Sequence, residues 1–171
     1  MPPAGLKAVL AAVGLVAVCP ALPAAAPPYR LTGQPAPDFA LHASAGPNVR
    51  LSEFRGDVVA LVFWGSRCGV CASQLASLSR LQQIYASAGL RTVGVGIDDD
   101  AIASAKFAAS QSTAFPLLLD PAKEVARAYR IDSLPMLLLI DRAGFIREVF
   151  RDFRSGGEAQ YVAPLKTLLD E

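Results

Sequence analysis

Two cysteines separated by two residues, Cys68 and Cys71, are the side chains of this sequence best suited to chemistry. They form a C-x-x-C motif that directly follows an apolar segment and opens an expected helix. The N-terminus of a helix carries free N–H groups and a partial positive charge, and both favour a thiolate, the form that attacks disulfides. We therefore predict a redox-active pair, with Cys68 as the attacking thiol and the more buried Cys71 as the resolving thiol.

Other uses of a C-x-x-C motif fit this sequence less well. A zinc site needs further ligands, and the chain has a single histidine, His42, which we expect to be an ordinary strand residue. Covalent haem attachment needs His after the second cysteine, where Ala72 stands. A structural disulfide remains an alternative, although so small a loop gains little by restricting the unfolded chain. We expect no metal and no cofactor.

A second signal is the tripeptide Ser133-Leu134-Pro135, which precedes an apolar segment with the pattern of a central strand. A proline at the start of such a strand is unusual unless its missing N–H is useful. A cis bond there would expose the backbone of Leu134, which could then pair with an extended substrate. The alternative is a trans proline that only starts the strand. We predict substrate binding by Leu134, Pro135 and Trp64, with Trp64 serving as packing and cover for the thiols.

The elements that must position these residues alternate between strand and helix. Apolar segments bounded by turn residues predict strands at 39–43, 48–51, 58–63, 91–97, 116–119, 136–140 and 145–150. Helical patterns predict a short turn at 52–56 and helices at 68–88, 101–110 and 122–129. A last helix should follow Gly156-Gly157 and end at about residue 169. The first two strands should form a hairpin, and Asp98, Asp99 and Asp100 should cap the helix that follows them. This order predicts one α/β domain with a mixed sheet flanked by helices.

The first residues have the pattern of a targeting segment. Lys7 is followed by the apolar run Ala8–Val18 and then by the small residues Ala24, Ala25 and Ala26. We predict a signal peptide or short membrane anchor over residues 1–25 and a folded domain over residues 29–171. Lipid attachment at Cys19 is an alternative. Export to the periplasm, in solution or on an anchor, places Cys68 and Cys71 where disulfides persist.

Length and charge restrict the function further. The 171 residues suffice for one domain, and 53% of them are apolar. Sixteen basic residues balance fifteen acidic ones, so the chain lacks the basic footprint of a nucleic-acid-binding protein. We expect a monomer that acts on protein thiols and disulfides.

The motifs in combination resemble the thioredoxin-like superfamily and, within it, the exported TlpA/ResA-like thiol–disulfide oxidoreductases. The resemblance covers nearly all of the chain after the targeting segment and rests on residues 33–39, 51–59, 63–71, 115–120, 134–135 and 139–141. It implies a thioredoxin fold with an N-terminal β-hairpin extension, Cys68 as nucleophile, Cys71 as resolver and Pro135 in cis. It also implies an extracytoplasmic reductant of the cytochrome c maturation type, supplied by a membrane-linked electron donor.

The sequence departs from that family at several positions, and three of these bear on the cysteine pair. Arg67 replaces the usual aromatic residue before the first cysteine, either as a solvated charge or as a cation that lowers the pKa of the Cys68 thiol. Gln74 replaces a glutamate that helps to move protons, and Val62 stands where thioredoxins keep a buried aspartate. We expect proton transfer at Cys71 to depend on water and turnover to be slow.

Two other functions use the same fold. A thiol peroxidase of the peroxiredoxin type has Thr or Ser three residues before its reactive cysteine, where this chain has Gly65. A non-catalytic metal carrier of the copper-chaperone type has three residues between its cysteines and a histidine further along the chain. This sequence has two residues between them and no histidine after Cys71. We therefore favour the thiol–disulfide oxidoreductase and keep these two functions as alternatives.

Overall fold

Strand β3 (Val58–Trp64) lies in the interior of a seven-stranded sheet in the computed structural model, which describes Met1 and residues 31–154 and 156–171. The strand order is β2-β1-β5-β4-β3-β6-β7. The other strands are β1 (Ala40–Ala43), β2 (Val49–Arg50), β4 (Leu90–Gly96), β5 (Leu117–Leu119), β6 (Met136–Ile140) and β7 (Ile146–Phe150). Every residue of β3 is buried, which explains its uninterrupted apolar sequence.

The sheet is mixed, as the sequence predicts. β3 and β5 pair in parallel with β4, whereas β6 and β7 continue the sheet on the other side of β3 in antiparallel pairs. The predicted hairpin is present as β1 and β2, and β1 also pairs with β5. The hairpin therefore extends the central sheet at one edge.

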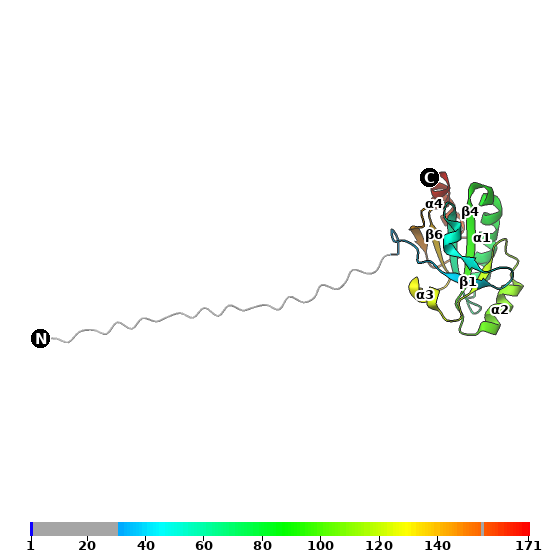
Figure 1. The fold of residues 1–171 in the computed structure, drawn as a ribbon, viewed down its shortest axis with the longest axis horizontal. Coiled ribbons are helices and arrows are strands. Elements are labelled where there is room, and N and C mark those ends of the chain that lie inside the picture. Colours follow the sequence, from blue (N-terminus) through cyan, green and yellow to red (C-terminus); the bar gives the residue numbers. More distant parts are fainter. Residues whose placement is uncertain (2–30, 155) are drawn as a thin grey trace.

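Helices cover both faces of this sheet (Figure 1). The helices are α1 (Cys71–Tyr85), α2 (Ala101–Ser110), α3 (Glu124–Ala128) and α4 (Ala159–Asp170), with short 3-10 turns at Leu51–Phe54 and Ala86–Ala88. Residues of α1, α2 and α4 share one apolar core with Val58, Ala60, Val62 and Trp64. The opposite face of β3 packs against α3 and the N-terminal segment that includes Leu31 and Phe39.

The expected signal peptide or anchor over residues 1–25 lies, apart from Met1, outside the described residues. Within residues 31–154 and 156–171, no helix has both the length and the apolar composition that crossing a membrane requires.

Candidate active site around Cys68 and Cys71

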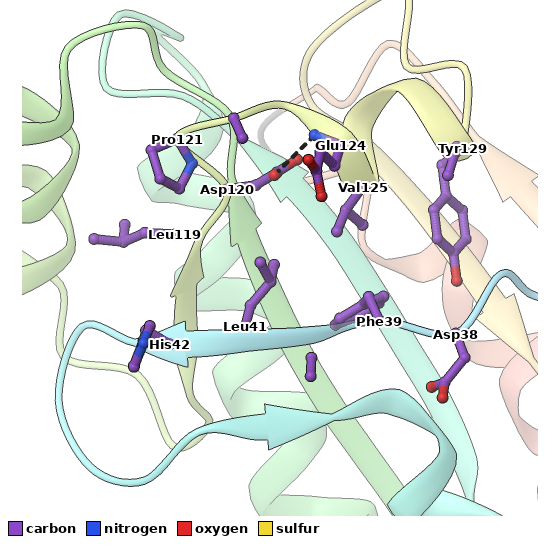
Figure 2. Close-up of a pocket in the computed structure, with 13 residues that line it drawn as sticks. Asp38, Phe39, Leu41, His42, Leu119, Asp120, Pro121, Glu124, Val125 and Tyr129 are labelled. Atoms are coloured by element: carbon purple, nitrogen blue, oxygen red, sulfur yellow. Dashed lines mark hydrogen bonds between the residues drawn. The ribbon is translucent and has the colours of Figure 1, made fainter.

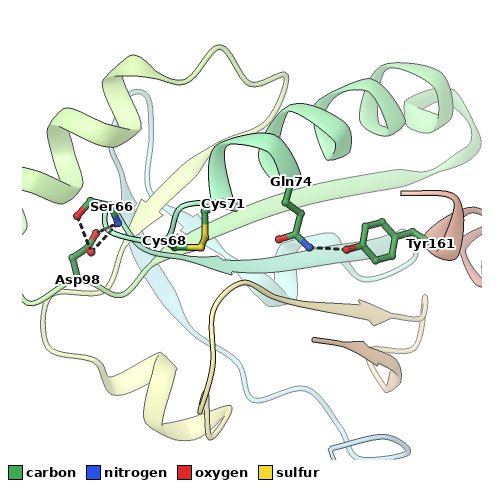
Figure 3. The surroundings of a disulfide bond; sticks show 6 residues. All are labelled: Ser66, Cys68, Cys71, Gln74, Asp98 and Tyr161. Carbon is green, nitrogen blue, oxygen red and sulfur yellow. Dashed lines mark hydrogen bonds between the residues drawn. A yellow bond between two sulfur atoms is a disulfide. The ribbon is translucent and has the colours of Figure 1, made fainter. Parts of the chain in front are cut away.

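Cys68 and Cys71 form a disulfide in the connection between β3 and α1 (Figure 3). Their Cα atoms are 5.4 Å apart. Cys71, the first residue of α1, is completely buried in the core, whereas Cys68 is partly exposed. Cys71 is thus the more buried cysteine, as expected, and the roles of attacking and resolving thiol stay a prediction.

The predicted start of the helix at Cys68 is wrong. Helix α1 begins at Cys71, with Val70 as its N-cap residue. Gly69 and Val70 form a turn in which the Cys71 N–H donates to the Cys68 carbonyl at 3.2 Å. Cys68 therefore precedes the first turn of α1, and Cys71 is its first residue rather than one turn inside it.

The segment containing Pro135 lies beside the loop that leads to Cys68. The Leu134–Pro135 peptide bond is cis, as the sequence predicts. Antiparallel pairing places Met136 of β6 opposite Phe63 of β3, so Pro135 lies level with the end of β3. Leu134 remains partly exposed there, and its predicted role in substrate binding, like that of Pro135, stays a prediction.

Trp64 lies beneath this surface rather than on it. Its indole is fully buried and stacks on Phe107 of α2, with ring centroids 5.1 Å apart. The ring nitrogen Nε1 finds no hydrogen-bond partner among the described residues. Trp64 therefore packs behind the motif. The prediction that it binds substrate is corrected, because no part of the indole is accessible.

The two residues predicted to modulate the pair lie in opposite environments. Arg67 is exposed on the loop before Cys68. Gln74, on the first turn of α1, is 1% exposed, and its Nε2 donates to the hydroxyl of Tyr161 at 2.8 Å (Figure 3). Burial raises the pKa of the Tyr161 hydroxyl, and hydrogen bonds with Gln74 and Gln160 offset only part of that rise. The group beside the buried end of the motif is therefore a neutral amide paired with a neutral phenol.

Sequence reasoning missed two residues that the structure brings to this site. Tyr161 reaches Gln74 from α4, a contact that depends on how that helix docks. Asp98 accepts hydrogen bonds from Ser66, whereas the sequence assigned it to the cap of α2. That cap is Asp100 alone, which accepts from the N–H groups of Ile102 and Ala103. The signal for Asp98 was available, since it follows the end of a strand parallel to β3.

A separate cavity of about 400 Å³ lies between β1 and α3 (Figure 2). His42, an ordinary strand residue of β1 as predicted, is part of its lining. Several polar groups of this cavity already serve the fold: Asp120 accepts from the Glu124 and Ala126 N–H groups, and the Tyr129 hydroxyl donates to the Pro37 carbonyl. No residue of the Cys68–Cys71 motif lines it.

Comparison with known proteins agrees with this geometry. The model of the AhpC/TSA family matches residues 32–149. The chain is 33% identical over 117 residues to the thiol-disulfide oxidoreductase ResA of Geobacillus kaustophilus, covering 68% of this chain and 67% of that protein. It is 32% identical to the protein of the same name from Bacillus subtilis, covering 68% and 65% of the two chains.

Solved structures give the same picture. The fold superposes with a TM-score of 0.76 on a protein of Chlorobium tepidum provisionally named thiol:disulfide interchange protein DsbE, at 31% identity, covering 81% of this chain and 97% of the other. The thioredoxin domain of a thiol-disulfide oxidoreductase from Bacteroides vulgatus gives a TM-score of 0.69 at 24% identity, covering 80% and 97%. The second likeness concerns the fold alone.

Proposed function

This chain belongs to the AhpC/TSA family and is a thiol–disulfide oxidoreductase, and we propose that it works outside the cytoplasm as a reductant of protein disulfides. The observation that carries the exchange chemistry is the unequal burial of the two cysteines: Cys68 is partly exposed, and Cys71 is completely buried. A partner protein can therefore reach one sulfur of the pair, and the other sulfur is kept for an intramolecular step.

The proposed reaction has two exchanges. In the dithiol form, the Cys68 thiolate attacks one sulfur of a substrate disulfide, forms a mixed disulfide and releases the other substrate sulfur as a thiol after it takes up a proton. Cys71, having lost its proton, then attacks the Cys68 sulfur and releases the second substrate thiol. The products are a reduced substrate and the Cys68–Cys71 disulfide. A dithiol protein on the membrane must supply the two electrons that restore the pair.

The surface beside Cys68 suits an extended polypeptide. Leu134 is partly exposed and precedes the cis bond to Pro135, directly next to the loop that carries Cys68. We propose that a substrate segment pairs with the backbone of Leu134 while its disulfide lies over Cys68. Trp64 contributes to this surface only by supporting it from below.

Two features support the location and the direction of electron flow. Residues 1–25 have the composition of an export signal or anchor, and an exported dithiol needs a source of electrons across the membrane. Gly69 and Val70, between the cysteines, carry no positive charge, so they do not stabilise the Cys68 thiolate in the way that a strong oxidant requires. Disulfides of apocytochromes c are the substrate class that this resemblance favours.

A thiol peroxidase receives less support from the site. Such an enzyme needs a hydroxyl side chain three residues before its reactive cysteine, and this chain has Gly65 there. A Cβ atom at this position would lie 2.9 Å from Cδ1 of Leu134, so Thr or Ser would not fit without a shift of that side chain.

The redox state of the pair in cells tests the proposal. Cells that produce the full chain are quenched in acid, free thiols are alkylated with a reagent that adds mass, and the protein is detected in periplasmic and cytoplasmic fractions. We expect periplasmic protein with both cysteines mostly as thiols, and oxidation of the pair when membrane-linked dithiol donors are deleted. Protein that is mostly disulfide in the periplasm would indicate an oxidant, and cytoplasmic protein would contradict the location.

A further inference from the structure

The register of two parallel strands places Asp98 opposite the loop that carries Cys68. Trp64, the last residue of β3, pairs with Gly96, the last residue of β4. Continued past both strand ends, the same register brings Ser66 opposite Asp98. The Ser66 N–H donates to both carboxylate oxygens of Asp98 at 2.8 and 2.9 Å, and the Ser66 hydroxyl donates to Oδ1 at 2.9 Å (Figure 3).

The residue before Ser66 shows that this contact is tightly packed. A Cβ atom built on Gly65 would lie 2.9 Å from Cδ1 of Leu134 and 3.3 Å from Oδ1 of Asp98. The loop therefore packs closely against both Asp98 and the segment of the cis proline at Gly65. The Cys68 N–H donates to the Gly65 carbonyl at 3.1 Å, so the Cys68 backbone is linked directly to Gly65.

The neighbouring aspartates have other partners, so Asp98 is the acidic side chain that binds this loop. A cavity of about 160 Å³ beside it is lined by the exposed Arg67, by Asp99 and by Asp100 among others. Asp99 pairs with Lys123, and Asp100 caps α2. Asp98 alone of the three aspartates hydrogen-bonds the loop before Cys68 in the described part of the chain.

We propose that Asp98 is a positioning residue for Cys68, which it fixes through Ser66 while its negative charge opposes the charge of the thiolate. The proposal rests on Cys68 being the attacking thiol. Its two parts have different consequences. The hydrogen bonds hold the Cys68 sulfur where a substrate disulfide can meet it. The negative charge makes the thiolate, and so the dithiol form, less stable relative to the disulfide. The hydrogen bonds would raise the rate of exchange in either direction, and the charge would favour a reductant over an oxidant.

Two substitutions separate the hydrogen bonds from the charge. Asp98→Asn keeps an oxygen that can accept from Ser66 but removes the charge, and Asp98→Ala removes both. Asp100→Asn is the matched control, because it removes the same charge two residues away and asparagine still caps a helix. For each full-length variant, the pH dependence of Cys68 alkylation, the rate of reduction of hydroxyethyl disulfide and the equilibrium with glutathione are measured. Far-UV circular dichroism and a urea titration establish folding.

We expect Asp98→Asn to lower the pKa of the Cys68 thiol by about half a unit and to shift the glutathione equilibrium about threefold toward the dithiol. Asp98→Ala should lower the exchange rate about tenfold in addition, because the loop loses its anchor. Asp100→Asn should change neither value. An alkylation profile that is the same in Asp98→Asn and the wild type, or that changes equally in Asp100→Asn, would overturn the proposal. If the wild-type protein reduces no disulfide while Asp98→Asn still shifts the alkylation profile of Cys68, the result would contradict the proposed function and leave the role of Asp98 intact.

Discussion

Gln74 on α1 and Tyr161 on α4 are joined by a hydrogen bond of 2.8 Å inside the core. Both side chains are about 1% exposed, and Oε1 of Gln74 has no partner among the described residues. A buried oxygen without a hydrogen bond destabilises the fold. In the proteins that this sequence resembles, the same position holds a glutamate that helps to move protons. The hydrogen bond links α1 to α4, but the neutral Gln74 amide is not a base that could take the proton of Cys71.

Gln74→Glu should therefore accelerate disulfide exchange at neutral pH. A glutamate in this buried place has a raised pKa because burial disfavours its charge, so it can take and return the proton of Cys71 near neutral pH. We expect an increase of about tenfold, below the roughly 10²–10⁴ of a fully adapted acid–base group. Stopped-flow reduction of hydroxyethyl disulfide measures it.

Gln83→Glu is the control for this experiment, since it makes the same change on the exposed side of α1. An unchanged or slower rate in Gln74→Glu, relative to both Gln83→Glu and the wild type, would show that another group or water already serves Cys71.

Tyr161→Phe should destabilise the fold by about 1–3 kcal/mol, because the buried Nε2 of Gln74 loses its acceptor. The ring itself remains to pack against Phe150 and Phe153, so the change isolates the hydroxyl. Urea unfolding gives the free energy. Tyr85→Phe, at a half-buried tyrosine of α1, provides the comparison and should cost less. Equal losses in the two variants would mean that the bond to Gln74 contributes nothing.

Sequence patterns predicted the elements of this fold closely where local chemistry marks their ends. Helix α2 has the predicted bounds, since Asp100 caps its first turn, and β6 begins directly after Pro135 as expected. The start of α1 was misplaced because nothing between Cys68 and Cys71 marks a helix boundary; Gly69 and Val70 form a turn that only the folded chain specifies.

The site shows the same division between local and long-range information. The cysteines and the cis proline are visible in the sequence as short motifs with a known context. Tyr161 is 87 positions from Gln74, and the contact exists only because α4 returns to the face that α1 covers. The burial of Trp64 could not be inferred from its place beside the motif, since it depends on Phe107 of α2 covering the ring.

Cys68 should react before Cys71 when the reduced protein meets a limiting amount of iodoacetamide. Cys68 has exposed surface and Cys71 has none, so reagent access and thiolate chemistry favour the same residue. Peptide mapping by mass spectrometry should find label on Cys68 in at least about nine of ten singly alkylated molecules, reflecting the roughly tenfold or larger advantage of an accessible thiolate. Label mainly on Cys71 would contradict the assignment of the nucleophile.

Gly96→Ala should destabilise the protein by about 1–3 kcal/mol through overpacking. A Cβ atom at Gly96 would lie 2.6 Å from two carbons of the Trp64 ring, which is fixed between the sheet and Phe107. Gly69→Ala is the control, because apart from its two chain neighbours no described residue has an atom within 4 Å of the added carbon. Thermal and urea unfolding should show a loss for Gly96→Ala alone; a loss of the same size at Gly69 would rule out contact with Trp64 as the cause.

The reduction potential of the pair should lie nearer the roughly −270 mV of thioredoxin than the roughly −120 mV of DsbA. A strong oxidant stabilises its reduced form through a very low thiolate pKa, and a positive charge between the cysteines is one way to achieve this. Gly69 and Val70 carry no charge, and Cys68 precedes the first turn of α1 rather than lying within it. Arg67 acts in the opposite direction, but it is exposed, and solvent screens its charge.

Equilibration of the full chain with glutathione or dithiothreitol buffers measures this potential. Val70→His supplies the internal control: it places a titratable cation between the sulfurs and should raise the potential, which shows that the assay responds to charge at this site. A wild-type value above about −170 mV, closer to the oxidants than to thioredoxin, would reverse the proposed direction of electron flow while leaving the chemistry of Cys68 and Cys71 unchanged.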